Sequence, residues 1–171
     1  MQRTYSTKKI AFLGLMLAVI VVLLAFERML PPLPFFPPNF KLGFSNIIVM
    51  FAIFFMGTRD AIVLGFLKSF FNMLMRGAVG GLISLAGGML SIGVIAGLIW
   101  VSRGKMSVLS LSIMGAIFHN IGQIVVAVII LQSPQLFMFF LPTLLVAGVI
   151  MGSLTGICAK ALMPVFERIY K

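Results

Sequence analysis

Long runs of hydrophobic residues alternate along the chain with short groups of charged residues, prolines and glycines. A helix that crosses the hydrocarbon core of a bilayer needs about 20 mostly apolar residues, and the runs are close to that length. The pattern therefore predicts an all-α integral membrane protein, a single bundle of six transmembrane helices that forms one domain over residues 1–171. The predicted spans cover about residues 8–29, 42–56, 61–75, 78–101, 108–131 and 143–163.

The breaks between the predicted spans follow from residue type. The first span ends at a proline-rich segment, PPLPFFPP (residues 31–38), because proline lacks the N–H that a continuing helix needs. Charged turns, GTRD (57–60) and SRGK (102–105), end the second and fourth spans. A further loop, QSPQLFMFFLP (132–142), is expected to connect the fifth span to the sixth. We expect PPLPFFPPNF and QSPQLFMFF to be outer loops that could close over a ligand.

Composition agrees with a location in the membrane. Hydrophobic residues make up 61% of the chain and charged residues 9%, and the mean hydropathy is +1.21. Soluble domains are usually about half apolar. The first apolar run follows Lys8 and Lys9 as a signal peptide would, but it continues into ERMLPPLPF instead of a cleavage site with small residues. It is therefore predicted to be a retained span.

The formal net charge of +10 is interpreted as a topology signal, since cytoplasmic loops of membrane proteins carry an excess of Lys and Arg. Nucleic-acid binding is disfavoured because the charges lie at span ends. With the N-terminus inside, most basic residues fall inside, which predicts that both termini are cytoplasmic. The inner set is Arg3, Lys8, Lys9, Arg59, Arg103, Lys105, Lys160, Arg168 and Lys171, and the outer set is Arg28, Lys41 and Arg76.

Polar residues inside the spans are the main functional signal, because burying an ionisable group in a membrane is expensive. Three of them recur at steps of four residues in the third span, which places them on one helix face. If the polar faces of spans two, three and five point inward, they line a net-positive cavity suited to a phosphate or carboxylate. The candidate substrate-binding residues are Lys41, Asn46, Lys68, Asn72, Arg76, His119, Asn120 and Gln123.

Each of these residues also has a purely structural alternative. Lys68 could snorkel or cap a helix, and Arg76 could anchor to lipid headgroups. The polar residues of the fifth span, His119, Asn120 and Gln123, could be hydrogen-bonded between helices. One histidine without Cys or carboxylate neighbours does not indicate a metal site. Their similar depth favours a shared binding site.

Small residues at four-residue spacing allow helices to approach closely in lipid. Three such stripes occur, and internal packing is the general interpretation for all of them. For Gly14 and Ala18 in the first span, a docking surface for another membrane subunit is the alternative. The other stripes are Gly93 and Gly97, and Gly148, Gly152 and Gly156.

Several kinds of catalytic chemistry lack their residues. No glycine-rich loop ends in Gly-Lys-Ser/Thr, so ATP hydrolysis by that route is not expected. Asp60 is the only aspartate, and Glu27 and Glu167 lie near opposite ends of the chain. No pair of carboxylates is available for metal-assisted or acid–base chemistry. No catalytic residue, bound cofactor or metal is therefore expected, and the chain is not predicted to be an enzyme.

Four motifs in a fixed order resemble the Gx transporter family, often labelled heptaprenyl diphosphate synthase component I. They are KLGFSNIIVMFAIFFMG after the proline-rich segment, SLAGGMLS, GAIFHNIGQ and LPTLLVAGVIMGSLTG, and the resemblance covers nearly the whole chain. That family is similar to the substrate-binding S components of energy-coupling factor (ECF) importers, six-helix proteins that capture vitamins or related micronutrients.

The resemblance implies partners in a prokaryotic plasma membrane. A transmembrane coupling protein and two cytoplasmic ATPases would supply the power stroke, so that only the partners use ATP. Ala11, Gly14 and Ala18 match the stripe that faces the coupling protein in such proteins. The cargo would be a small, vitamin-like molecule, anionic or phosphorylated, with flavins as one example.

The alternative function is a membrane anchor or accessory subunit of a prenyl diphosphate synthase or a redox complex. Such a protein would hold a cytoplasmic enzyme through the GTRD and SRGK turns and the C-terminal tail. The synthase label itself fits the sequence poorly, because prenyl diphosphate synthases hold magnesium with aspartate-rich motifs and this chain has one aspartate.

Overall fold

The computed structural model describes residues 7–29 and 43–170, with side chains up to residue 164. The described residues form helices joined by short turns, with no strand among them, which confirms the predicted all-α class. Four of the helices are long and apolar enough to cross a membrane, and α2 is shorter. The helices are α1 (Thr7–Met29), α2 (Asn46–Phe55), α3 (Thr58–Val101), α4 (Val108–Leu131) and α5 (Gln135–Tyr170).

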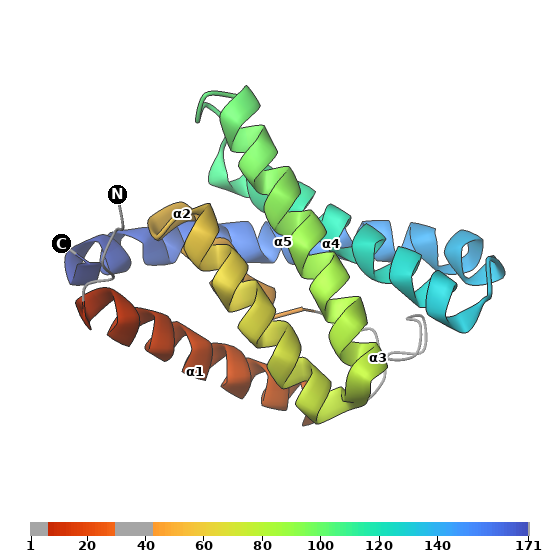
Figure 1. Ribbon diagram of the computed structural model, residues 1–171. Coiled ribbons are helices and arrows are strands. Elements are labelled where there is room, and N and C mark those ends of the chain that lie inside the picture. The colour runs from red at the N-terminus through yellow and green to blue at the C-terminus, as the bar shows by residue number, and fades with distance from the viewer. Residues whose placement is uncertain (1–6, 30–42, 171) are drawn as a thin grey trace.

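Helix α3 runs through the predicted boundary between the third and fourth spans, so the described chain has five helices where the sequence predicts six spans. The helix is interrupted at Gly77, whose φ of 81° and ψ of 172° are not helical. This conformation is accessible essentially to glycine alone. Figure 1 shows the two parts of α3 as the arms of a V. We call residues 58–76 the first arm and residues 78–101 the second arm.

Replacing Gly77 with alanine should destabilise the protein through the backbone alone. No atom lies within 4 Å of the place that an added Cβ would take, so the cost is that of a strained φ, about 1–3 kcal/mol. Gly88→Ala is the matched control, because that site is also open and helical, and alanine is the better helix former. Thermal unfolding in detergent should show a lower Tm for Gly77→Ala only. An equal change in both variants would contradict the account.

The predicted loop at residues 132–142 is wrong, because α5 begins at Gln135. Pro134 lies just before the helix, where its fixed φ suits a first turn and its missing N–H costs nothing. The N–H groups of Leu136 and Phe137 donate to the carbonyls of Ser133 and Pro134. Most of QSPQLFMFF is therefore helix and not a closing loop. The other predicted loop, PPLPFFPPNF, lies outside the described residues.

Glycines hold α5 close to α4. An added Cβ on Gly152 would lie 2.6 Å from Cα of Ile113, and one on Gly148 would lie 3.1 Å from Cα of Ile117. This confirms internal packing for the stripe of residues 148, 152 and 156. At Gly14 and at Gly93 an added Cβ would meet no atom within 4 Å, so the other two stripes are not packed in this way.

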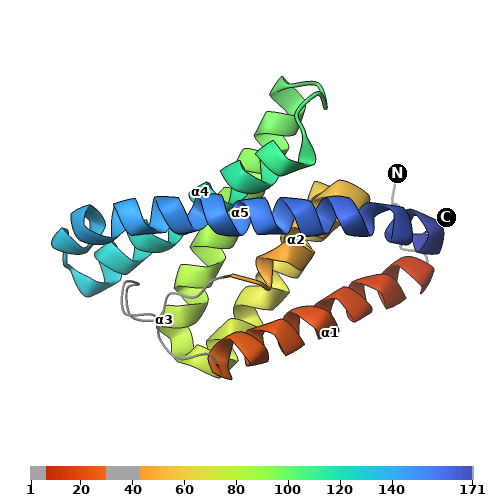
Figure 2. The same cartoon turned by 180° about the vertical axis from the view of Figure 1, so that it is seen from behind.

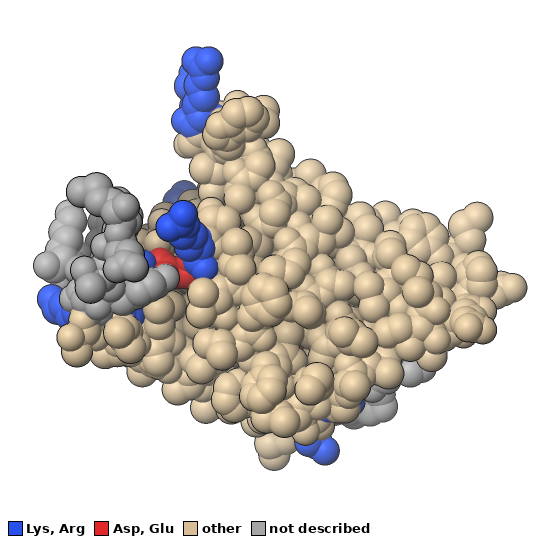
Figure 3. All heavy atoms as spheres, in the orientation of Figure 1, with Lys and Arg blue, Asp and Glu red and all other residues tan. Residues whose placement is uncertain are grey.

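Two clusters of buried apolar side chains support the fold. The larger joins α1, α2 and both arms of α3 and includes Ile20, Phe51 and Leu64. The smaller joins the second arm of α3 to α4 and α5, around Ile124 and Leu144. Much apolar surface remains outside these clusters. On the face in Figure 3, Lys and Arg lie toward the edges of the molecule, and a broad surface carries no charge, as expected for contact with lipid.

Both ribbon views show which helix ends and turns lie near one another. The start of α1, the end of α5 and the turn between α2 and α3 lie near one another in Figures 1 and 2. The bend of α3 and the turn between α4 and α5 lie away from them. An ion pair of 2.6 Å between Lys9 Nζ and the buried Asp60 Oδ2 joins the starts of α1 and α3. These two helices therefore begin on the same side of the molecule.

Candidate functional site

Lys68 is the centre of a group of buried polar side chains. It lies in the first arm of α3 with only 4% of its surface exposed. Its Nζ donates a hydrogen bond to Oδ1 of Asn46, the first residue of α2. A buried ammonium group needs such partners, because water no longer solvates it. The structure thus brings together two of the residues that the sequence analysis placed in one site.

Asn72 follows Lys68 by one helical turn and is equally buried. Its Nδ2 donates to the carbonyl oxygen of Gly80, at 2.9 Å, across the break at Gly77. The side chain therefore ties the two arms of α3 together. Arg76, one turn further, is half-buried near the bend. Within the predicted stripe, Lys68 thus reaches α2 and Asn72 reaches the second arm of α3.

Glu27 is a member of this group that the sequence analysis missed. It is 4% exposed, and its Oε1 accepts a hydrogen bond of 2.9 Å from the backbone N–H of Ser45, next to Asn46. Its negative charge acts on both Lys68 and Arg76. The sequence shows an acid at the end of an apolar span, but not which cation or N–H group it meets.

Helix α4 adds His119 and Gln123, one turn apart. The His119 side chain is 5% exposed, its ring lies against the backbone of Gly87, and the charge of Lys68 acts on it. An added Cβ on Gly87 would lie 2.7 Å from Cγ of Gln123, so both side chains pack against this glycine. Four helices thus contribute to one group. We call it the polar cluster, made of Glu27, Asn46, Lys68, Asn72, His119 and Gln123, with Arg76 at its edge.

Several acceptor atoms in the polar cluster have no partner among the described residues. Asn72 Oδ1, His119 Nδ1 and Gln123 Oε1 are buried without a hydrogen bond. Buried polar atoms are nearly always paired, and leaving one unpaired costs about 1–3 kcal/mol. The two other such atoms in the described part of the chain belong to Asp60 and Ser112, outside the cluster. These three atoms therefore have no hydrogen-bond donor among the described residues.

Two predicted site residues are not part of this arrangement. Asn120 Nδ2 donates to the carbonyl oxygen of Leu144, at 2.8 Å, and so connects α4 to α5. It points away from His119 because neighbouring residues of a helix differ in direction by about 100°. Lys41 lies outside the described residues. The candidate docking residues Ala11, Gly14 and Ala18 are exposed on the outer face of α1.

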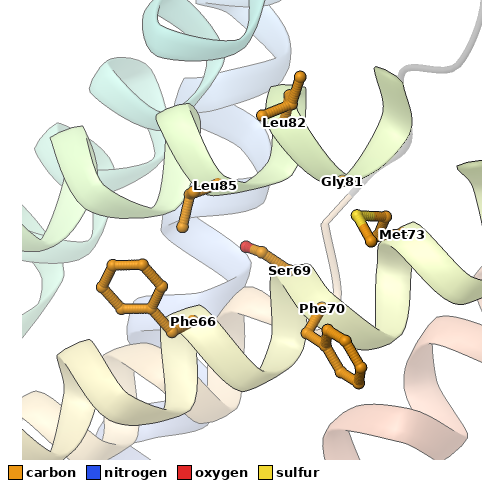
Figure 4. A pocket seen from close by; sticks show the side chains of 7 residues that line it. All are labelled: Phe66, Ser69, Phe70, Met73, Gly81, Leu82 and Leu85. Atoms are coloured by element: carbon orange, nitrogen blue, oxygen red, sulfur yellow. The ribbon is translucent and has the colours of Figure 1, made fainter. Parts of the chain in front are cut away.

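A separate apolar groove of about 160 Å³ lies between the two arms of α3. Figure 4 shows Phe66 and Phe70 of the first arm on one side and Leu82 and Leu85 of the second on the other. The Ser69 hydroxyl in the groove already donates to the carbonyl oxygen of Gly65, at 2.8 Å. The groove therefore suits hydrocarbon and offers a polar molecule little.

The residues that carry charge define what chemistry is accessible. Among the described residues, no three His, Cys, Asp or Glu side chains come together as metal ligands do.

A family model described as heptaprenyl diphosphate synthase component I matches residues 16–162. The chain belongs to this family. No curated protein and no solved structure matches it.

The polar cluster lies entirely within the part of the chain that matches heptaprenyl diphosphate synthase component I. The name of the family mentions a synthase, but the cluster holds a single carboxylate, Glu27, which is bonded to Ser45. The other described carboxylate, Asp60, is paired with Lys9 at the start of α3, away from the cluster. Magnesium-dependent diphosphate chemistry uses several carboxylates together, and the described residues of this family member do not assemble them.

Proposed function

We propose that this protein captures a small, vitamin-like molecule in the polar cluster and acts as the S subunit of an ECF importer. The observation that carries the proposal is the set of three buried acceptors without protein partners, on Asn72, His119 and Gln123. A membrane protein that only had to fold would gain by pairing these atoms or replacing them. A bound molecule satisfies them at the moment of capture.

The proposed topology has six passes through the plasma membrane. They are α1, α2, the two arms of α3, α4 and α5, with both termini in the cytoplasm. Support comes from the basic residues Lys8, Lys9, Arg59 and Arg103, which lie at the start of α1 and in the turns at either end of α3. An excess of such residues favours the cytoplasmic side.

The proposed partners are a transmembrane coupling protein and two ATPases, and the proposed docking surface is the outer face of α1. Ala11, Gly14 and Ala18 are exposed along this face, and Gly14 has open space beside it. Small residues let a partner helix approach closely within a bilayer. This protein itself performs no chemistry in the proposed cycle.

Two substitutions should separate capture from docking. His119→Phe keeps a ring but removes Nδ1, so retention of the captured molecule should fall about tenfold or more. Gly14→Leu adds bulk to an open face, so capture should persist while co-purification with the coupling protein is lost. Native mass spectrometry measures the first effect and affinity purification from the native membrane the second.

Gly93→Leu is the control for docking, since it adds the same bulk to an open position on α3 and should leave association unchanged. The proposal would be contradicted by loss of capture in Gly14→Leu together with unchanged capture in His119→Phe. Purification of a prenyl diphosphate synthase in place of the coupling protein and ATPases would favour the accessory-subunit alternative.

A further inference from the structure

The unpaired atoms of the polar cluster are all of one kind. Nδ2 of Asn72 already donates to Gly80, which fixes the orientation of the amide and leaves Oδ1 as the unpaired atom. An amide oxygen can only accept a hydrogen bond. Oε1 of Gln123, which is also buried and unpaired, has the same chemistry.

The unpaired nitrogen of His119 is also an acceptor. The ring packs against the backbone of Gly87, where an added Cβ would lie 3.0 Å from Cε1 of the ring, and the buried Nδ1 has no hydrogen-bond partner. A neutral imidazole carries its hydrogen on one nitrogen and a lone pair on the other, so with the hydrogen on Nε2 the unpaired Nδ1 is an acceptor.

The charges of the polar cluster are balanced in its buried part. Lys68 and Glu27 are both 4% exposed, and the charge of Glu27 acts on Lys68. Lys68 also donates to Asn46. Half-buried Arg76 experiences the charge of Glu27 as well. A phosphate or carboxylate brought to this place would find the charge of Lys68 already balanced by Glu27 and would meet three unpaired acceptor atoms, which do not donate to it.

We propose that the polar cluster recognises a neutral molecule by its hydrogen-bond donors, at least two N–H or O–H groups presented to Asn72, His119 and Gln123. A nitrogen heterocycle with ring N–H groups, or a polyol, has this chemistry. The inference rests on the proposed capture function and narrows it, since the sequence alone favours an anionic or phosphorylated cargo. Sites built to hydrogen-bond a ligand discriminate strongly against molecules that lack the matching groups.

Two substitutions at Gln123 test whether the captured molecule is a neutral hydrogen-bond donor or an anion. The probe is the small molecule that organic solvent releases from the purified wild-type chain, added back to each variant and followed by native mass spectrometry. Gln123→Glu keeps the length and the acceptor oxygens, so affinity should stay within about threefold. Gln123→Met keeps the length without a comparable acceptor, so affinity should fall about tenfold or more. The reverse order, with Gln123→Glu losing the molecule and Gln123→Met keeping it, would show an anionic cargo and overturn the inference.

A second measurement needs no variant. The released molecule is transferred to D₂O, and its gain in mass counts the hydrogens on nitrogen and oxygen. We expect no net charge at pH 7 and at least two exchangeable hydrogens. A phosphorylated or carboxylated molecule with fewer than two other donors would overturn the inference while leaving capture intact. If the wild-type chain releases no small molecule, the proposed function fails, and this inference fails with it.

Discussion

Replacing Lys68 with methionine is expected to lower the free energy of unfolding by about 3 kcal/mol. The change leaves the acceptor oxygen of Asn46 without its donor. It also removes a cation that acts on buried Glu27. Methionine fills a similar volume, so the effect reports charge and hydrogen bonding more than packing. The measurement is equilibrium unfolding in mixed detergent micelles.

A double-mutant cycle separates the ion–ion contribution from the rest. Glu27→Gln alone should also destabilise, since it leaves Lys68 with less compensation for its burial. The double variant Glu27→Gln/Lys68→Met removes both charges and should regain about 1 kcal/mol or more relative to the sum of the single effects. If the two effects add without such a gain, Glu27 and Lys68 are not coupled and the balanced-charge description of the polar cluster is wrong.

Gly152→Leu is expected to disrupt the packing of α5 on α4, at a cost of about 3 kcal/mol or more. Even the first added carbon would lie 2.6 Å from Cα of Ile113 and 2.9 Å from the carbonyl oxygen of Ser112. Both contacts are with backbone atoms, so the helices must separate, which is costlier than moving a side chain. Thermal unfolding and the yield of monodisperse protein would record the loss.

Gly97→Leu is the matched control, because it adds the same side chain inside a helix where no atom lies within 4 Å. We expect its Tm to stay close to that of the wild type or to rise slightly, since leucine is a better helix former than glycine. Similar losses in Gly97→Leu and Gly152→Leu would show that the helices tolerate no bulk anywhere, and would refute the specific role of the α4–α5 contact.

The parts of the fold that sequence could predict are those with local causes. Hydrophobic run length located most of the helices, and the predicted spans 61–75 and 78–101 left a break between them, where the structure has the bend at Gly77. The geometry of this bend involves contacts that the sequence does not show, such as the hydrogen bond from Asn72 to Gly80. The start of α5 at Gln135 was missed for a different reason. Proline is compatible with a helix start as well as with a loop, so Pro134 did not distinguish the two.

The residue types of the candidate site could be predicted, but not which of their side chains point into the polar cluster. Steps of four residues place Lys68 and Asn72 on one face without any structure. Adjacent positions are different, because only the packing of α4 between α3 and α5 assigns His119 to the cluster and Asn120 to Leu144. Glu27 was missed because its partners come from α3 and from the residue before α2, which no local pattern connects to the end of α1.

Native mass spectrometry of the detergent-purified chain, from mild to increasing collision energy, tests the capture function most directly. We expect one bound small molecule per chain that survives removal of lipids, and we expect His119→Phe to lose it while the protein stays monodisperse. A wild-type chain that carries lipids alone under every condition, and that co-purifies with a prenyl diphosphate synthase, would contradict the central claim that the polar cluster captures a small molecule.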